Sequence, residues 1–329
     1  MDQLIGLTNQ TTRRQFTIGS IVAGAALVLP RITVVAAAAR QNADLAVTGL
    51  PTLDITVLDD GYEGVPETLE AGRYHVTVRI NENNAFGGFG GVAFMQPPAG
   101  MSPDEFLAAF GIGPHLASPE QGGASPAAAG ENGGGLPAVV HQAAYAGGTV
   151  IGPEGSPRSI VLDLTAGQWI AWADEPSAPQ APVIFTVTGA FPNEVAEPES
   201  DIAVTLVDFG INVDGNLVAG DHTLAIENQG AEPHFLLLDR YLGDLDLDND
   251  FMTAALEAEM SGAAMPDGFD PETDLESVAI SLTQSTGTTT WLEVSLVAGT
   301  YLATCFFPTA GTGVPHAMMG MHQVFTVTG

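Results

Sequence analysis

The sequence predicts an all-β protein made of two tandem β-sandwiches of one type, each with a short helix in a connection. Its apolar stretches are short and rich in Val, Ile, Leu and Thr, and the chain contains 39 Gly and 22 Pro, which is typical of strands joined by turns. At 329 residues, the chain is long enough for two ordinary domains. Segments of the first half recur in the second half, which indicates a duplicated unit.

The N-terminal segment carries the features of an export signal. Arg13 and Arg14 precede an apolar run over residues 18–29, and this arrangement resembles the twin-arginine (Tat) export signal. Small residues at 36–39 suit a signal peptidase, and the apolar run ends at a proline, too short for a comfortable membrane span. We therefore expect residues 1–40 to be a Tat signal peptide and the protein to be periplasmic, extracellular or at the cell surface. Membrane contact is expected only through an uncleaved signal.

The duplicated unit is visible in segments that resemble each other. Three pairs of segments match: 71–81 and 219–228, 164–173 and 296–305, and 185–189 and 325–329. The last pair is identical, since both copies read Phe-Thr-Val-Thr-Gly. Residues 191–200, rich in Pro and Glu, are typical of a linker. These observations predict one sandwich at 41–190, a linker at 191–200 and a second sandwich at 201–329.

Each copy also carries one helix signal. In the first copy, Ser-Pro-Asp-Glu at 102–105 forms a capping box with proline at the first helical position, followed by apolar residues. In the second copy, Asp248 or Asn249 can cap a helix over 251–260. A short helix is therefore expected in one connection of each sandwich.

The charge balance limits the partners. The chain has 39 acidic side chains against eight arginines, no lysine, and a formal net charge of −31. This composition argues against nucleic acid, because phosphate binding needs clustered Lys or Arg. The acidity is typical of solubility and salt tolerance, and it also suits steering towards a basic redox partner.

Four side chains of the second copy form a candidate metal site: His234, Cys305, His316 and Met321. Two imidazoles and a thiolate in one plane, with a weak thioether along the axis, are the ligand set of a blue-copper centre. Cys305 is the sole cysteine, so the chain forms no internal disulfide, and a bound metal would account for an exported lone thiol. Cys305 aligns with Ala173, so we expect the first copy to lack metal ligands and to orient or shield the second.

The motifs around these residues resemble the plastocyanin-like cupredoxins, including halocyanin-type proteins. The matching features are Gly-Thr-Tyr-x-x-x-Cys at 299–305, Asn-x-Gly-x-x-Pro-His at 228–234, and a histidine five residues before Met321. The resemblance covers residues 201–329. It implies two cupredoxin-like Greek-key sandwiches, one type 1 copper ion in the second, and His316 as the solvent-edge histidine through which electrons pass. The copper ligands it implies are His234, Cys305, His316 and Met321.

The loop between the ligands departs from this family. Residues 306–315 separate Cys305 from His316, whereas plastocyanin-like domains have a shorter loop there. The axial position is also open to Met318 and Met319, and His322 is a rival imidazole. Spacing from His316 favours Met321.

The leading functional hypothesis is an exported one-electron carrier, with no substrate turnover and an unidentified redox partner protein. We expect no enzyme activity of the oxidase or reductase kind. A trinuclear copper centre needs further imidazoles, usually in His-x-His pairs, and the chain has seven His and no such pair.

Two alternatives remain open from the sequence. The dense run from His316 to His322 suits a copper storage or delivery protein that holds Cu(I). The chain would otherwise be a metal-free interaction module, with both sandwiches binding a partner. A blue Cu(II) protein with reversible electrochemistry would distinguish a carrier from either alternative.

Overall fold

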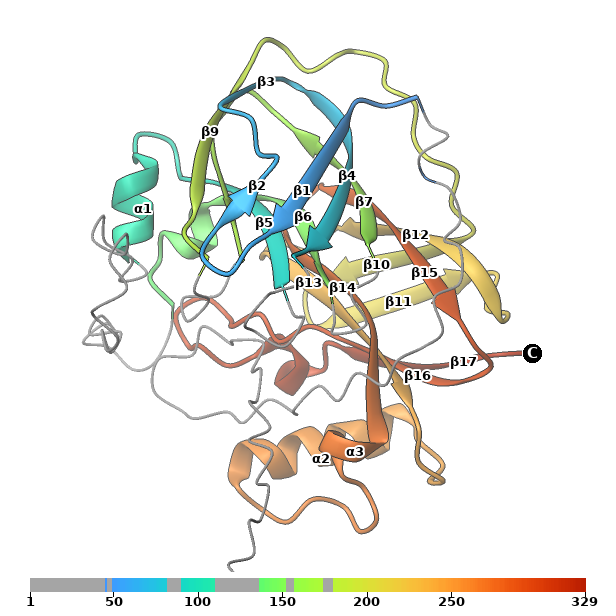
Figure 1. Cartoon of the computed structure of the whole chain (residues 1–329). Coiled ribbons are helices and arrows are strands. Elements are labelled where there is room, and N and C mark those ends of the chain that lie inside the picture. The colour runs from blue at the N-terminus through green and yellow to red at the C-terminus, as the bar shows by residue number, and fades with distance from the viewer. Residues whose placement is uncertain (1–44, 46–48, 82–89, 110–135, 152–156, 174–179) are drawn as a thin grey trace, which may run out of the picture.

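The computed structural model describes residues 45, 49–81, 90–109, 136–151, 157–173 and 180–329. The predicted signal peptide at 1–40 lies outside the described residues. Two β-sheets of eight and nine strands form the body of the molecule, and helices lie in the connections (Figure 1). This arrangement confirms the predicted all-β class, with helices confined to the connections.

The first sheet contains, in order across it, β11 (Gly210–Gly215), β10 (Ile202–Val207), β12 (Gly220–Asn228), β15 (Thr289–Leu296), β7 (Arg158–Leu164), β4 (Gly72–Ile80), β1 (Thr52–Val57) and β2 (Tyr62–Glu63). The second sheet contains β17 (His322–Val327), β16 (Gly299–Thr304), β13 (His234–Tyr241), β14 (Leu275–Gln284), β6 (Ala144–Ile151), β5 (Gly90–Gln96), β8 (Gly167–Trp172), β9 (Val183–Thr188) and β3 (Thr68–Glu70). Alternating burial along β1 and β10 follows the two-residue period of a strand with one face in the core.

The strand orders show the duplication directly. In each half, the first strand pairs in parallel with a later strand of the same sheet, β1 with β4 and β10 with β12. Counted from the junction between the halves, corresponding strands follow in the same order on both sides, so the two halves are arranged in mirror order. The halves meet where β15 pairs with β7 and β14 pairs with β6, both antiparallel. Both sheets therefore continue from one half into the other, because these inner strand edges complete each other's hydrogen bonds. The similarity between the two halves of the sequence did not indicate that the halves share their sheets.

Side chains also cross the boundary between the halves. The Arg73 guanidinium lies 4.4 Å from the ring centre of Trp291, in the second half. The same guanidinium holds Asp163 through two hydrogen bonds of 2.7 and 2.9 Å. Thr149 donates to the carbonyl of Ile280 across the β6–β14 junction. Buried, hydrogen-bonded contacts of this kind fix the two halves in one orientation.

The helices confirm the predicted caps. In α1 (Pro103–Ala109), the Glu105 carboxylate accepts from the Ser102 backbone N–H, and the Glu105 N–H donates to the Ser102 hydroxyl. Asp248 caps α2 (Asn249–Ser261) by accepting from the Phe251 N–H at 2.8 Å. The remaining turns of helix are α3 (Pro271–Asp274), η2 (Val140–Gln142) and η3 (His316–Met319).

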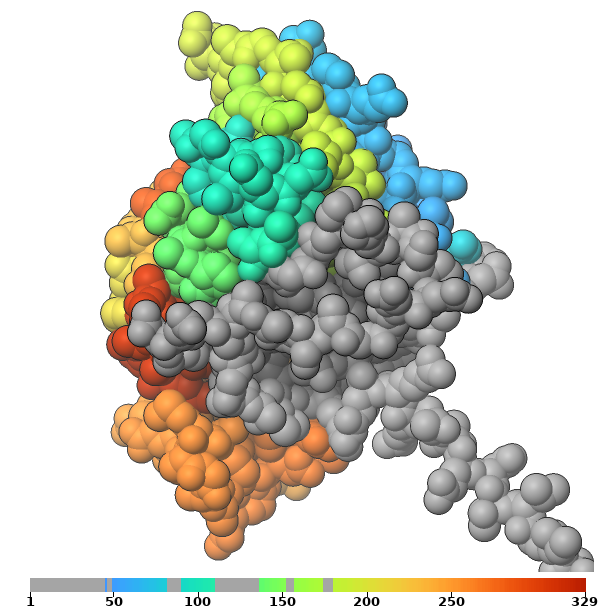
Figure 2. All heavy atoms as spheres, turned by 90° about the vertical axis from the view of Figure 1, so that its left-hand side faces the viewer, coloured from blue at the N-terminus to red at the C-terminus, as the bar shows by residue number. Residues whose placement is uncertain are grey.

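Helix α2 is placed beside the C-terminal strands. It packs against η3 and β17, and Figure 2 shows its orange surface next to the red C-terminal segment. In the part of the chain that the structure describes, no helix is both long and apolar enough to cross a membrane.

Candidate metal centre

Three neighbouring strands bring the predicted ligands to one end of the second sheet. His234 opens β13, Cys305 directly follows β16, and Met321 directly precedes β17. Because β13 and β17 both pair antiparallel with β16, the starts of the outer strands lie beside the end of the middle one. The register of β13 shifts between His234 and Leu236, an irregularity of the kind that re-aims a side chain at a functional site. His316 enters from the loop, as the first residue of η3.

Three ligand atoms of different segments converge. The Nδ1 atoms of His234 and His316 are 2.9 Å apart, and the Cys305 sulfur lies 3.9 Å from each. All three side chains are fully buried. Among the described residues, no other three His, Cys, Asp or Glu side chains gather this closely. The structure thus brings together His234, Cys305 and His316 as the sequence predicts.

Each imidazole is oriented by a carboxylate on its far side. His234 Nε2 lies 3.2 Å from Asp208 Oδ1, and His316 Nε2 lies 3.1 Å from Glu232 Oε2. A carboxylate is an acceptor, so each Nε2 carries the hydrogen and each Nδ1 presents its lone pair to the centre. Neither carboxylate was predicted from the sequence. Glu232 lies inside the 228–234 motif, whereas Asp208 is at a hairpin tip with no sequence signal.

The thiol of Cys305 is held protonated in the absence of a cation. Burial raises the pKa of Cys305 to about 12, although the N–H groups of Phe235 and Phe307 favour the thiolate. The Phe235 N–H points at the sulfur from 3.4 Å. A bound cation would therefore have to displace the thiol proton, and these donors would then stabilise the thiolate.

The imidazoles are in the opposite state, neutral and ready to bind. Burial lowers the pKa of His234 to about 4, the nearby His316 lowers it further, and Asp208 opposes the shift. Burial also lowers the pKa of His316, against the raising effect of Glu232. Two neutral imidazoles and a thiol sulfur in one buried group form a donor set for a borderline or soft metal ion.

The neighbouring methionines differ in their surroundings. Met321 is fully buried in the same core cluster as Cys305, its carbonyl accepts from the Cys305 N–H, and its own N–H donates to the carbonyl of His316. Met318 packs instead against the cluster under α2. Met319 is 45% exposed, and its sulfur accepts from Thr309. Burial and backbone placement therefore favour Met321 over the other two.

The rival imidazole has partners elsewhere. Nδ1 of His322 lies 3.3 Å from the carbonyl of Ala317, and Nε2 lies 3.1 Å from the Thr253 hydroxyl and 3.2 Å from the carbonyl of Asn249. His322 thus connects η3 and β17 to α2. Its position explains its burial without a metal.

The spacing of the donor atoms suits a single copper-sized ion. An ion about 2.1 Å from each nitrogen and about 2.3 Å from the sulfur can join donors up to roughly 4.2–4.4 Å apart. The observed separations of 2.9 and 3.9 Å fall below that limit. The residues present therefore fit the metal that the resemblance implies.

The long loop after Cys305 covers His316. Pro308 and Pro315 form a β-bridge, and Thr309 and Val314 hydrogen bond inside it, so the insertion is a compact hairpin-like loop. The expectation that His316 is a solvent-edge residue differs from the structure, since its side chain is fully buried. The ring of Phe209, which is 37% exposed, lies edge-on to His316 at 5.6 Å.

The first half closes another side of the centre. His141 in η2 packs edge-on against Phe307 at 5.5 Å, and Phe307 lies 5.9 Å from the ring of His316. Both ring nitrogens of His141 are buried without a hydrogen-bond partner among the described residues, and burial lowers the pKa of this imidazole. The first half thus supplies a ring that contacts Phe307, which in turn lies next to His316.

Metal affinity is expected to rise with pH. Between pH 7 and 8, the thiol of Cys305 keeps its proton while both imidazoles are neutral, so binding of a divalent ion releases one proton. The apparent affinity for Zn(II) should then rise about tenfold per pH unit. Competition with a chromophoric chelator at pH 7, 7.5 and 8 measures this slope. A flat profile would show that the thiol does not bind the ion.

The comparisons with known proteins concern mainly the fold. No family model matches the chain, and no curated protein matches it. Similar solved structures include a reduced auracyanin from Roseiflexus castenholzii, 19% identical, with a TM-score of 0.24, over 39% of this chain and 97% of that one. Auracyanin A of Chloroflexus aurantiacus, described as a "blue" copper protein, is 18% identical with a TM-score of 0.22, over 38% of this chain and 99% of that one.

Copper proteins whose match covers most of this chain are also among the similar structures. The copper nitrite reductase of Nitrosomonas europaea is 12% identical with a TM-score of 0.21, over 84% of this chain and 93% of that one. Multicopper oxidases are among the similar structures as well. These findings correct the sequence-based expectation against an oxidase or reductase role, because copper enzymes stand beside the auracyanins among the similar structures. The fold is shared by proteins of both kinds and does not by itself assign a function.

Proposed function

We propose that this chain is an exported type 1 (blue) copper protein that transfers single electrons at a centre formed by His234, Cys305, His316 and Met321. The observation that carries the proposal is the convergence of two imidazole nitrogens and the sole thiol within 3.9 Å, in a fully buried group. Nitrogen and sulfur donors in this combination suit both Cu(I) and Cu(II).

The residues of the chain prepare the centre for this role. Bound copper would supply one-electron chemistry by alternating between Cu(I) and Cu(II). His234 and Cys305 lie at the ends of hydrogen-bonded strands, so the ligand positions change little between oxidation states. Burial by Phe209 and Phe307 excludes water and thereby limits the rearrangement that accompanies a change in charge.

Export, domain roles and partner belong to the same proposal. The Arg13–Arg14 motif supports Tat export with residues 1–40 as the signal, to the periplasm, cell surface or medium. Residues 41–190 would form the metal-free domain, and 201–329 the copper domain. The electron would be exchanged with a redox partner protein near Phe209, since this ring joins the surface to His316.

Copper loading tests the proposal. The full chain, purified without metal and then titrated with Cu(II), is expected to bind one copper ion and to show an intense visible thiolate-to-copper band that disappears reversibly on reduction. A colourless protein that holds only Cu(I) would instead indicate storage or delivery. A protein that retains no copper would contradict both.

The same titration tests the axial residue with a matched pair of variants. Met321→Leu should change the visible band and raise the reduction potential, because a weak sulfur donor to the oxidised ion is lost. Met319→Leu should leave both unchanged, since this side chain points outward. Equal spectra for Met321→Leu and the unsubstituted protein would exclude Met321 as a ligand.

A further inference from the structure

Two acidic side chains contact the outer nitrogens of the histidines. Asp208 is in the tip of the β10–β11 hairpin and faces His234, while Glu232 precedes β13 and faces His316. The distances from carboxylate oxygen to Nε2 are 3.2 and 3.1 Å. Each imidazole thus has one negative charge in direct contact with its outer nitrogen.

The carboxylates are held by the backbone independently of the imidazoles. Asp208 accepts from the N–H groups of Ala231, at 2.9 and 3.0 Å, and Glu232, at 3.3 Å. Glu232 accepts from the N–H of Ala310, in the inserted loop, at 3.1 Å. The two side chains therefore tie together the hairpin tip, the segment before β13 and the loop after Cys305. Their places are built into the fold.

The hairpin tip shows the same specificity of placement. Phe209, next to Asp208, has a φ of 63°, and it is the sole residue other than glycine with positive φ in the described part of the chain. This left-handed conformation is uncommon for a bulky residue and persists where surrounding contacts determine it. This conformation lets two consecutive residues contact the two histidines. Asp208 contacts Nε2 of His234, and the ring of Phe209 packs edge-on against His316.

Negative charge at these two points has a definite effect on an ion in the centre. A carboxylate that accepts from Nε2–H makes the imidazole a stronger donor through Nδ1. Its charge also attracts a divalent ion more than a monovalent one, and a buried centre screens this attraction less than bulk water does. Both effects favour the oxidised, divalent state.

We propose that Asp208 and Glu232 are positioning residues that set the metal preference of the centre, favouring a divalent over a monovalent ion and thereby lowering its reduction potential. The inference rests on the proposed copper function and deepens it. Glu232 should have the larger effect on the potential. Its side chain is 25% exposed and that of Asp208 is 37% exposed, so solvent screens the charge of Glu232 less.

Neutral isosteres test the proposal. Asp208→Asn and Glu232→Gln keep an oxygen for the backbone N–H groups but remove the charge. Each should lower Zn(II) affinity about tenfold and leave Cu(I) affinity, measured against a Cu(I) chelator, within about threefold. If Cu(II) affinity falls as Zn(II) affinity does, the potential rises by about 59 mV for each tenfold change in the Cu(II)-to-Cu(I) affinity ratio.

Asp214→Asn is the matched control. Asp214 is an exposed carboxylate in β11, on the same hairpin as Asp208. Its replacement by Asn removes the same single negative charge, but away from the two imidazoles. Asp214→Asn should change the Zn(II) and Cu(I) affinities by no more than about twofold. The Cu(II)-to-Cu(I) affinity ratio, which sets the reduction potential, should also change by no more than about twofold. Thermal unfolding of the metal-free variants checks the fold, and Glu232→Gln decides the question alone if Asp208→Asn fails to fold.

The outcomes separate this inference from the proposed function. Potentials of the two variants that stay within the shift of Asp214→Asn, or that fall, would overturn the role of the carboxylates while the protein remains a blue copper protein. An unsubstituted chain without the thiolate-to-copper band would overturn the proposed function instead. In that case, the Zn(II) titration still reports on the carboxylates, and unchanged Zn(II) affinity would overturn their role as well.

Discussion

Replacing Cys305 by serine is expected to abolish the intense visible absorption of the copper-loaded protein and to weaken Cu(II) binding by roughly a thousandfold. The band needs a thiolate bound to copper, and a serine hydroxyl supplies neither the soft sulfur nor, near neutral pH, a negative charge. Two imidazoles and a thioether would remain, which hold Cu(II) far less tightly. Visible spectroscopy and chelator competition measure the two effects.

The variant also requires a control for folding. Cys305 is fully buried and free, so serine places a hydroxyl among apolar neighbours and should cost about 1–3 kcal/mol. Urea unfolding of the metal-free protein measures this loss separately from metal binding. If Cys305→Ser folds and still binds copper with a strong visible band, sulfur ligation is wrong and the redox proposal fails with it.

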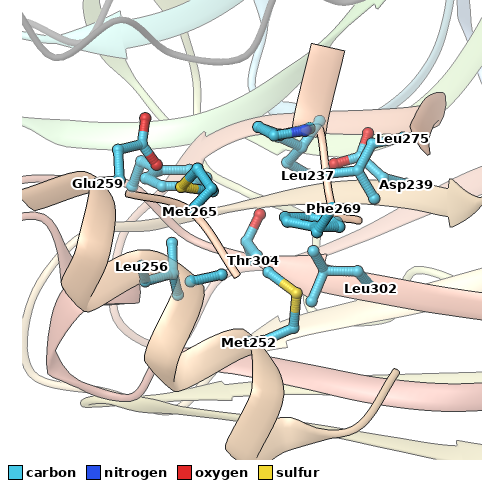
Figure 3. Close-up of a pocket in the computed structure, with 13 residues that line it drawn as sticks. Leu237, Asp239, Met252, Leu256, Glu259, Met265, Phe269, Leu275, Leu302 and Thr304 are labelled. Atoms are coloured by element: carbon cyan, nitrogen blue, oxygen red, sulfur yellow. The ribbon is translucent and has the colours of Figure 1, made fainter. Parts of the chain in front are cut away.

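Removing the charge of Asp239 is expected to stabilise the protein strongly at alkaline pH. Asp239 lines a small apolar pocket between α2 and the second sheet, together with Thr304 and Glu259 (Figure 3). Burial raises the pKa of Asp239 to about 7, against a lowering hydrogen bond from Ser277. The folded protein thus keeps a proton there that the unfolded chain releases.

The sign of the pH effect follows from the two pKa values. Between about pH 4 and 7, the folded state binds more protons at Asp239 than the unfolded state, so stability falls as pH rises. A shift of about three units corresponds to about 4 kcal/mol above pH 7. Asp239→Asn keeps the shape and removes this penalty, and it should raise the free energy of unfolding at pH 8 by about 3 kcal/mol.

Urea unfolding of the metal-free protein at pH 4 and pH 8 measures this gain. At pH 4 the folded carboxyl is already protonated, so the variant should differ little from the unsubstituted protein. Asp244→Asn, an exposed carboxylate in the following loop, should stay within about 0.5 kcal/mol at both values. An equal gain at pH 4 and 8 would show that packing, and not charge, accounts for the stabilisation.

The sequence predicted the parts of this structure that depend on local pattern or direct repetition. Alternating apolar residues gave the strands, and the capping residues Ser102 and Asp248 gave two helix starts. The cluster of His234, Cys305 and His316 was predictable because both residue types are rare in this chain: there is one Cys, and the histidines number seven. Rarity made the coincidence of Cys305, His316 and Met321 in one short segment informative.

The rest depends on contacts between distant segments of ordinary composition. Glu232 is 84 residues from His316, and Asp208 is one of 39 acidic residues, so neither stands out in the sequence. The burial of His316 depends on the inserted loop, on Phe209 and on Phe307, which only the folded chain brings together. The expectation of no oxidase or reductase activity depended on the number of histidines. That number tests only for a trinuclear copper centre, whereas one fold can carry many different activities.

The junction of β14 with β6 and β15 with β7 has a consequence for dissecting the molecule. Cutting the chain within 191–200 would leave each fragment with two unpaired edge strands. The free backbone N–H and C=O groups of such edges pair readily with other strands. Since the two halves are related by mirror strand order, the fragment 201–329 could cover its margins with a second copy of itself. Under the proposed function, such a pair would carry two copper centres, one in each copy, whereas the single chain would carry one.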